Sequence, residues 1–287
     1  MAGTPERTAV VTDSTAYLPD DLVAEAGLSV VPLGVVIGGV AGVEGIDVTP
    51  ADVAKALEAR RVAVTTSRPA PATFEQEYQR LFDEGATGVV SVHLSAHLSG
   101  THDAADLAAR RFDGRVVVVD SCSTGMGLGF PALAAARLAA AGGSLAEVAS
   151  AARDTIGRTT TLFYVDTLEF LRRGGRIGAA SALLGTALSV KPILRVADDG
   201  IVVREKVRTA SRALARLVDL AVEAAGESEV DVAVHHLAAP ERAEALRGSL
   251  ADRLDGRIGC CLVTEVGAAV GAHAGPGLAS VVVHRRP

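Results

Sequence analysis

Four short segments rich in hydroxyl side chains follow or lie between apolar runs of the sequence, and each could bind an anion. They are Thr12 to Thr15, Thr65 to Pro69, Ser95 to Thr101 and Asp120 to Gly125. Each precedes an expected helix, whose free N–H groups and positive dipole end favour a negatively charged oxygen. For any one segment considered alone, an ordinary helix cap is a better explanation than an anion site. Their expected common place after parallel strands predicts one anion site without a metal at a sheet edge.

The acidic residues in these segments have a structural interpretation. Asp13 and Asp120 are expected to accept hydrogen bonds from loop N–H groups. We predict that Ser14, Ser95 and Ser121 shape the same loops.

A lone histidine, His273, opens the segment His273 to Gly277, which contains two glycines and a proline. Such a segment fixes an unusual backbone path, so we predict that His273 binds a ligand and that Gly275 shapes its loop. Arg176 follows the pair Gly174-Gly175, which allows a sharp turn. Arg176 is therefore a candidate for contacting a partner or a ligand.

The segment from Gly178 to Val190 carries no charged residue. A core helix and a helix lining an acyl tunnel would share this pattern, and periodicity leaves both interpretations open.

Motifs of enzymes and metal sites are missing from the sequence. It has no GxSxG, GxxxxGK[ST] or HExxH segment, and the glycines from Gly125 to Gly129 are wrongly spaced for a dinucleotide loop. The 3 cysteines, Cys122, Cys260 and Cys261, match neither CxxC nor a zinc spacing. We therefore expect a non-enzyme with no cofactor and no metal, in a reducing compartment.

Composition narrows the class of protein further. The 287 residues fit two domains, and 49% hydrophobic residues with only 3% aromatics predict an aliphatic interior. The net charge of -6 argues against a nucleic-acid partner. The first residues lack the basic start and apolar run of a signal peptide, so we expect a cytoplasmic protein.

The elements that must position these side chains differ between two parts of the chain. Residues 1–158 alternate β-branched strands with amphipathic helices, which predicts a doubly wound, parallel-sheet α/β domain. Helix starts are expected at Thr49, Thr73 and Ser144, each with an acid or amide three residues on. The expected strands are Thr8 to Thr12, Ser29 to Ile37, Gly88 to Leu94 and Arg115 to Val119.

Residues 159–287 predict a second domain with a mixed sheet and helices on one side. A turn at Asp198 to Gly200 joins two strands in an antiparallel hairpin. Helices are expected over Thr209 to Ala225 and Pro240 to Leu254. The strands are Thr159 to Tyr164, Lys191 to Val196, Ile201 to Val207, Val230 to His235, Gly259 to Thr264 and Leu278 to His284.

Taken together, the motifs resemble the DegV family of bacterial fatty-acid-binding proteins. The resemblance implies a Rossmann-like N-terminal domain, a mixed-sheet α/β C-terminal domain and an apolar ligand tunnel between them. The matching segments extend along nearly the whole chain: Thr12 to Ala16, Thr66 to Pro69, Leu98 to Thr101, Met126 to Gly129, Asp166 to Glu169, Gly174 to Ile177, Lys191 to Leu194 and His273 to Gly277.

The resemblance also implies a function. The protein would bind a long-chain fatty acid and present its carboxylate to a separate fatty acid kinase, which forms an acyl phosphate. Arg176 and Arg208 would meet the kinase or make transient contact with the membrane. The residues implied at the carboxylate are Thr66, Ser99 and His273, with Ser67, Gly100 and Thr101 beside them.

The sequence departs from the family pattern at Arg68, where a Gln-like residue is usual, at Ala274, where Thr is usual, and at Ala96-His97. Chain-length preference therefore stays open. Two other functions remain as alternatives. One is an acyl hydrolase or an acyl or phosphoryl-transfer enzyme with Ser99 as nucleophile and His273 as base. The other is a lipid-responsive regulator.

Overall fold

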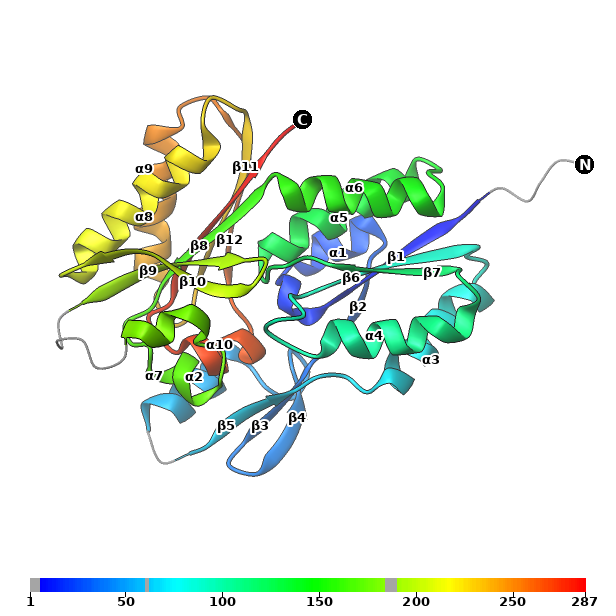
Figure 1. Ribbon diagram of the computed structural model, residues 1–287, viewed down its shortest axis with the longest axis horizontal. Helices are drawn as coiled ribbons and strands as arrows, with labels where there is room; N and C mark the ends of the chain where they lie inside the picture. The colour runs from blue at the N-terminus through cyan, green and yellow to red at the C-terminus, as the bar shows by residue number, and fades with distance from the viewer. Residues whose placement is uncertain (1–5, 60–61, 184–189) are drawn as a thin grey trace, which may run out of the picture. The chain divides into compact units, whose positions relative to one another are not determined.

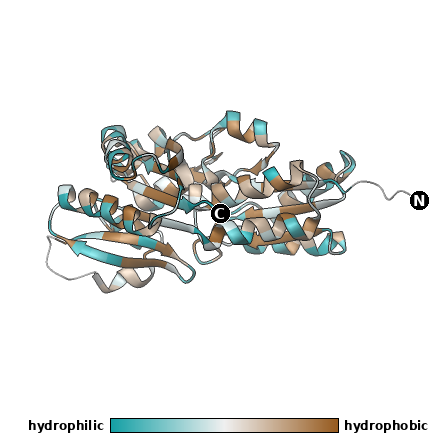
Figure 2. Ribbon diagram, turned by 90° about the horizontal axis from the view of Figure 1, so that it is seen from above, coloured by the Kyte–Doolittle hydropathy of each residue, from teal (hydrophilic) through white to brown (hydrophobic). Residues whose placement is uncertain are grey.

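The structure is a computed structural model and describes residues 6–59, 62–183 and 190–287 (Figure 1). Within these ranges, no helix is both long enough and apolar enough to cross a membrane. The helices show alternating hydrophobic and hydrophilic bands (Figure 2), as expected of helices that cover a sheet with one face.

The chain folds into two compact units, and each is made of two stretches of sequence. The first unit joins Met1–Leu33 to Arg68–Gly157, and the second joins Gly34–Ser67 to Arg158–Pro287. The later boundary lies next to the expected division at residue 158. The stretch Gly34–Ser67, however, belongs to the second unit rather than to the first.

The first unit is built on a parallel sheet in the strand order β2-β1-β6-β7. The expected fold class of this part is confirmed. Valine runs in β6 and β7 pair along their whole length, as in a sheet that is covered on both faces. The strands are β1 (Thr8–Asp13), β2 (Ser29–Val31), β6 (Gly88–His93) and β7 (Val116–Asp120).

Helices cover both faces of this sheet (Figure 1). Helices α5 and α6 lie on one face, with α1 against α5, and α3 and α4 lie on the other. On the α3 side, Phe74 and Tyr78 pack with the alanines of α4 over Val11 and Val89. The helices are α1 (Asp20–Ala26), α3 (Pro71–Asp83), α4 (Thr101–Ala109), α5 (Met126–Ala140) and α6 (Leu145–Gly157).

The second unit contains a mixed sheet of 6 strands in the order β10-β9-β8-β13-β11-β12. Only β11 and β12 pair in parallel, so the expected mixed sheet and its β9–β10 hairpin are confirmed. The strands are β8 (Thr159–Tyr164), β9 (Lys191–Ala197), β10 (Gly200–Val207), β11 (Val230–His236), β12 (Ile258–Glu265) and β13 (Ala279–Arg285).

Two long helices, α8 (Ala210–Ala225) and α9 (Pro240–Arg253), bury one face of this sheet. Their leucines and alanines pack on β-branched residues of the strands, which gives the aliphatic core that the composition predicted. Two shorter helices, α7 (Glu169–Arg173) and α10 (Ala268–Ala274), lie in the same unit. Of the uncharged segment 178–190, Gly178–Leu183 forms a 3-10 turn, and residues 184–189 lie outside the described residues.

A small antiparallel sheet, in the order β4-β3-β5, was not expected. The prediction of one strand from Ser29 to Ile37 was wrong, because Pro32 lacks an N–H donor and the run divides between β2 and β3. The prediction of a loop from Thr65 to Pro69 was also wrong in part, since Val64–Ser67 is a strand. The elements of this region are β3 (Gly34–Ile37), β4 (Val40–Val43), α2 (Pro50–Glu58) and β5 (Val64–Ser67).

Capping side chains start two of the helices as expected. Thr49 and Asp52 form a capping box at α2, and Ser144 and Glu147 exchange the same hydrogen bonds at α6. The start expected at Thr73 was wrong, because α3 begins two residues earlier at Pro71, whose fixed φ suits the first helical position.

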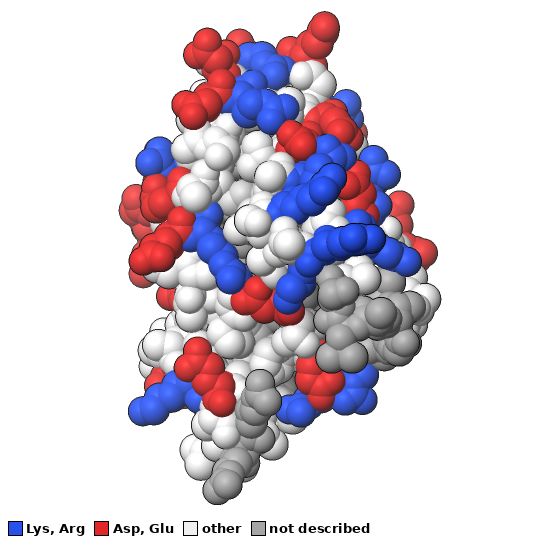
Figure 3. Space-filling model, turned by 90° about the vertical axis from the view of Figure 1, so that its left-hand side faces the viewer, with Lys and Arg blue, Asp and Glu red and all other residues white. Residues whose placement is uncertain are grey.

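Charged side chains are mixed on the surface. On the face drawn in Figure 3, basic and acidic side chains lie next to one another over much of the area. Arg216, for example, pairs with both Glu205 and Asp219, and Asp219 also pairs with Arg253. Such pairing reduces any field of one sign that would attract a polyanion.

Candidate ligand-binding residues

Two of the predicted ligand residues, Thr66 and His273, meet in the second unit. Thr66 lies on β5 opposite Val35 of β3, and its Oγ1 is 2.8 Å from Nε2 of His273. His273 was expected in a loop, but it belongs to the last turn of α10. The prediction that Thr66 follows a strand of the parallel sheet was wrong as well, because β5 belongs to the small antiparallel sheet.

Helix α10, which carries His273, is capped by a residue from the other stretch of sequence in the second unit. Glu44 is only 6% exposed, and its Oε1 accepts a hydrogen bond of 2.7 Å from the backbone N–H of Ala269. A carboxylate at this place satisfies a free N–H group of the first turn and complements the helix dipole. Sequence reasoning missed Glu44, because the two residues are 225 positions apart.

The imidazole of His273 is enclosed on its other side by Gly174. A Cβ atom on Gly174 would overlap Nδ1 of His273, so only a glycine allows this approach. Burial, together with the nearby charge of Arg176, lowers the pKa of His273 to about 4. His273 is therefore neutral at neutral pH. Arg176 donates a hydrogen bond from Nη1 to the carbonyl of Gly174, so it lies beside this histidine.

The neutral imidazole carries one proton, and its surroundings favour Nε2 as the site. Nδ1 is buried and has no hydrogen-bond partner among the described residues. A buried N–H donor without a partner costs about 1 to 3 kcal/mol, whereas Nε2–H can donate to Thr66 Oγ1. In this arrangement the hydroxyl proton of Thr66 is directed away from His273 and is available to an anion.

Replacing Gly174 by alanine is expected to lower the free energy of unfolding by about 1 to 2 kcal/mol, because the new methyl group must displace the imidazole from Thr66. Urea unfolding measures the change. Gly248→Ala is the matched control, since Gly248 lies within α9 with open space where a Cβ would stand. The control should be unchanged or slightly more stable. Equal stability of the two variants would show that the ring adjusts freely.

The loop after His273 has the unusual backbone that its glycines predicted. Gly275 has a φ of 78°, and a Cβ there would overlap the ring of Phe170. Gly277 has a φ of 84° and lies against the carboxylate of Asp166. Asp166 in turn accepts hydrogen bonds from Tyr164 and Arg242. These contacts fix the chain that leads from α10 to β13.

The first unit presents a separate group of hydroxyls at the start of α4. Ser99 Oγ and Thr101 Oγ1 are 2.9 Å apart, and Gly100 stands between them as the residue before the helix. The loop that leads to them is closed by Ser95, whose carbonyl accepts hydrogen bonds from the N–H groups of Leu98 and Ser99. Ser99, Gly100 and Thr101 thus lie in one hydrogen-bonded turn.

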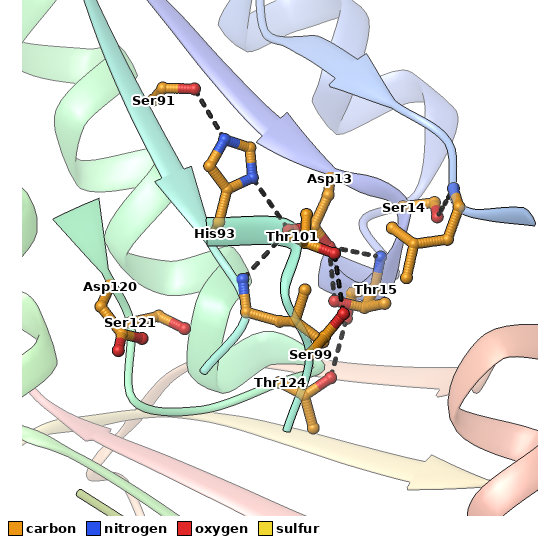
Figure 4. A network of polar contacts seen from close by, with 12 residues as sticks. Asp13, Ser14, Thr15, Ser91, His93, Ser99, Thr101, Asp120, Ser121 and Thr124 are labelled. Carbon is orange, nitrogen blue, oxygen red and sulfur yellow. Dashed lines mark hydrogen bonds and ion pairs between the residues drawn. The ribbon is translucent and has the colours of Figure 1, made fainter. Parts of the chain in front are cut away.

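Asp13 lies at the centre of a fully buried polar network beneath this turn (Figure 4). Its Oδ1 accepts hydrogen bonds from the N–H and the hydroxyl of Thr15, and its Oδ2 accepts one of 3.0 Å from the N–H of Leu94. Nδ1 of His93 also lies 3.0 Å from Oδ2. The carboxylate therefore ties two of the predicted loops together.

The network continues from His93 into the core. Nε2 of His93 is 2.7 Å from Ser91 Oγ, which accepts a hydrogen bond of 2.8 Å from the hydroxyl of Tyr78. Burial raises the pKa of Tyr78, which keeps the phenol protonated as the donor. The order of contacts is that of the catalytic triad of a serine hydrolase, with Ser91, His93 and Asp13 in sequence. All three are 0% exposed, so a substrate cannot reach Ser91 and this arrangement has a structural role.

Asp120 organises the loop after β7 through two backbone hydrogen bonds. Its carboxylate accepts hydrogen bonds from the N–H groups of Ala96 and Cys122. Ser121 Oγ accepts one from the N–H of Ser123 and donates to the carbonyl of that residue. At the first loop, Ser14 Oγ accepts a hydrogen bond from the N–H of Leu33.

Comparison with known proteins decides the family. The DegV family model matches residues 7–286. The chain belongs to the DegV family. A DegV domain-containing protein of Streptomyces coelicolor is 54% identical over 278 residues, which cover 97% of this chain and 98% of the relative.

Solved structures of DegV proteins have the same fold. A fatty-acid-binding DegV family protein from Thermus thermophilus has a TM-score of 0.91 and 34% identity, with coverage of 98% of this chain and 100% of the other. DegV from Bacillus subtilis, described as a fatty-acid-binding protein, has a TM-score of 0.88 and 30% identity, with the same coverage.

Two predicted residues and two positions that depart from the family pattern remain to be placed. Ser67 is exposed at the end of β5, and Arg208 is exposed after β10. Ala274 is buried at the end of α10. Arg68 is exposed, and its side chain lies against Gly100.

Proposed function

We propose that this DegV protein binds a long-chain fatty acid and that Thr66, Ser99 and His273 hold its carboxylate. The hydrogen bond between Thr66 and the neutral His273 carries the proposal, because it leaves a hydroxyl donor for an anion. The fatty-acid-binding proteins of Thermus thermophilus and Bacillus subtilis support the ligand class. Two points support the role of Ser99: its match to the family pattern and its place in a hydrogen-bonded turn in the first unit.

The acyl chain supplies most of the binding energy in this proposal. Burial of about sixteen carbons contributes roughly 12 kcal/mol before ordering costs, at about 0.8 kcal/mol for each methylene. The polar residues then select the carboxyl end and fix its position. No cofactor takes part.

The proposed role continues with a separate fatty acid kinase, which phosphorylates the bound carboxylate to an acyl phosphate. Hydroxyls and a neutral imidazole hold a carboxylate without a bidentate clamp, so one oxygen stays available for the phosphoryl group. The protein itself performs no chemistry in this scheme. Arg176 and the exposed Arg208 are the proposed contacts for the kinase or, transiently, for the membrane.

Replacing Thr66 by valine is expected to weaken oleate binding by roughly tenfold to a hundredfold, since a hydrogen bond to a charged group contributes about 1.5 to 3 kcal/mol. Thr65→Val is the matched control, because Thr65 is the exposed neighbour on the same strand. Titration with oleate measures both affinities, and native mass spectrometry of the purified protein identifies any lipid that it carries. Absence of lipid together with absence of saturable oleate binding would refute the proposal.

Reconstitution with a fatty acid kinase and ATP tests the second part. Acyl phosphate should form only when both proteins are present. Turnover of an acyl ester or an acyl phosphate by the isolated protein, abolished by Ser99→Ala, would instead make it an enzyme.

A further inference from the structure

The side chain of Arg68 lies against Gly100. A Cβ atom on Gly100 would lie 3.0 Å from Cδ and 3.1 Å from Cζ of Arg68 and would overlap its Nη1. Gly100 has a φ of -76°, which any residue adopts. A methyl group at this position would therefore have to push the exposed guanidinium aside.

Packing alone holds this guanidinium. Arg68 makes no hydrogen bond or ion pair with any residue in the described ranges, although a guanidinium has five N–H donors. Two other exposed arginines of the same unit, Arg80 and Arg111, pair with Glu77 and Glu75. Arg68 thus keeps a positive charge in a defined position without a carboxylate beside it.

Arg68 is also close to two of the proposed ligand residues. It follows Thr66 by two positions, so their Cα atoms are at most about 7 Å apart. Its guanidinium contacts Gly100, which is bonded directly to Ser99. Within the first unit, the guanidinium therefore lies beside the residue that follows Ser99, one of the residues proposed to bind the carboxylate.

We propose that Arg68 binds the anionic head group of the acyl ligand and selects ionised lipids, a carboxylate or an acyl phosphate, over neutral lipids with the same chain. The inference rests on the proposed function and adds the residue that recognises the negative charge of the head group. Thr66, which accepts a hydrogen bond from His273, provides an uncharged donor, and such a donor also binds a neutral hydroxyl head group, although more weakly than an anion. The exposed position of Arg68 makes its attraction sensitive to salt.

The test compares oleate with oleyl alcohol, which share the chain and differ in charge. Affinities are measured by titration at low and at high salt for the full chain and for Arg68→Gln. The variant is expected to bind oleate about tenfold more weakly at low salt, with the difference shrinking at high salt, and to bind oleyl alcohol unchanged. Gly100→Ala should reproduce this selective loss, because the methyl group displaces the guanidinium.

Arg111→Gln is the matched control, since it removes one exposed positive charge from the same unit. If the unmodified protein binds neither ligand, the proposed function fails and this inference fails with it. If the unmodified protein binds oleate while Arg68→Gln keeps the same affinity and the same preference for the acid, only the role of Arg68 is refuted. An equal loss for oleate and oleyl alcohol would also refute it, because such a loss reports altered packing.

Discussion

Replacing Asp13 by alanine should lower the free energy of unfolding by about 3 to 5 kcal/mol, the largest effect that we expect from any single substitution in this protein. The carboxylate is 0% exposed and accepts hydrogen bonds from Thr15 and Leu94, with His93 beside it. Alanine would leave these buried N–H groups without a partner. Urea unfolding measures the loss.

The same substitution at Asp106 provides the control, because Asp106 is 47% exposed on α4 and forms a surface pair with Arg110. Its loss should change stability by about 1 kcal/mol or less. Asp13→Asn keeps one acceptor oxygen, so its loss of stability should lie between those of Asp13→Ala and Asp106→Ala. A loss at Asp13 as small as that at Asp106 would mean that water replaces the carboxylate at little cost.

Acidification from pH 7 to pH 4 is expected to destabilise the protein through two histidines. Burial lowers the pKa of His235 to about 4, and burial with the charge of Arg176 does the same for His273. An unfolded histidine titrates near 6.5, so between pH 6.5 and 4 the unfolded chain binds protons that the folded chain does not. Stability is therefore highest above pH 6.5 and falls as the pH drops, by up to about 3 kcal/mol for each histidine.

Urea unfolding at a series of pH values measures this slope. His273→Gln should be less stable at pH 7 but should lose less stability on acidification, because one of the two groups is gone. The proposed ligand should act in the opposite direction, since a carboxylate next to His273 raises its pKa. A variant with the same slope as the unmodified protein would show that His273 titrates normally.

Most of the strands and the division into a parallel and a mixed sheet could be predicted from the sequence, because runs of valine and isoleucine mark buried strands directly. The small sheet could not, since β3, β4 and β5 are short and pair with one another across turns and a helix. Hydrophobic pattern shows that Val35 is buried but carries no information about which strand lies beside it. Pro32 was the one local signal for the break.

The candidate site could be predicted only in part for the same reason. Single residues such as Thr66 and His273 stand out by their surroundings in the sequence, yet their meeting depends on a fold that the sequence pattern did not supply. Gly174 seemed to serve only a turn, whereas its missing side chain makes room for an imidazole nearly a hundred residues later. Long-range contacts of this kind leave no periodic signal.

The cap that Glu44 forms on α10 can be made only after translation has reached α10. At about 5 to 20 residues per second, the ribosome needs roughly 10 to 45 seconds to make the 225 residues from Glu44 to Ala269. For most of that interval the stretch Gly34–Ser67 has been made, while the rest of its unit, Arg158–Pro287, is still being synthesised. Thr66 therefore meets His273 only after the ribosome has made α10, and a nascent chain that stalls before α10 lacks this pair of residues, which we propose as part of the carboxylate site.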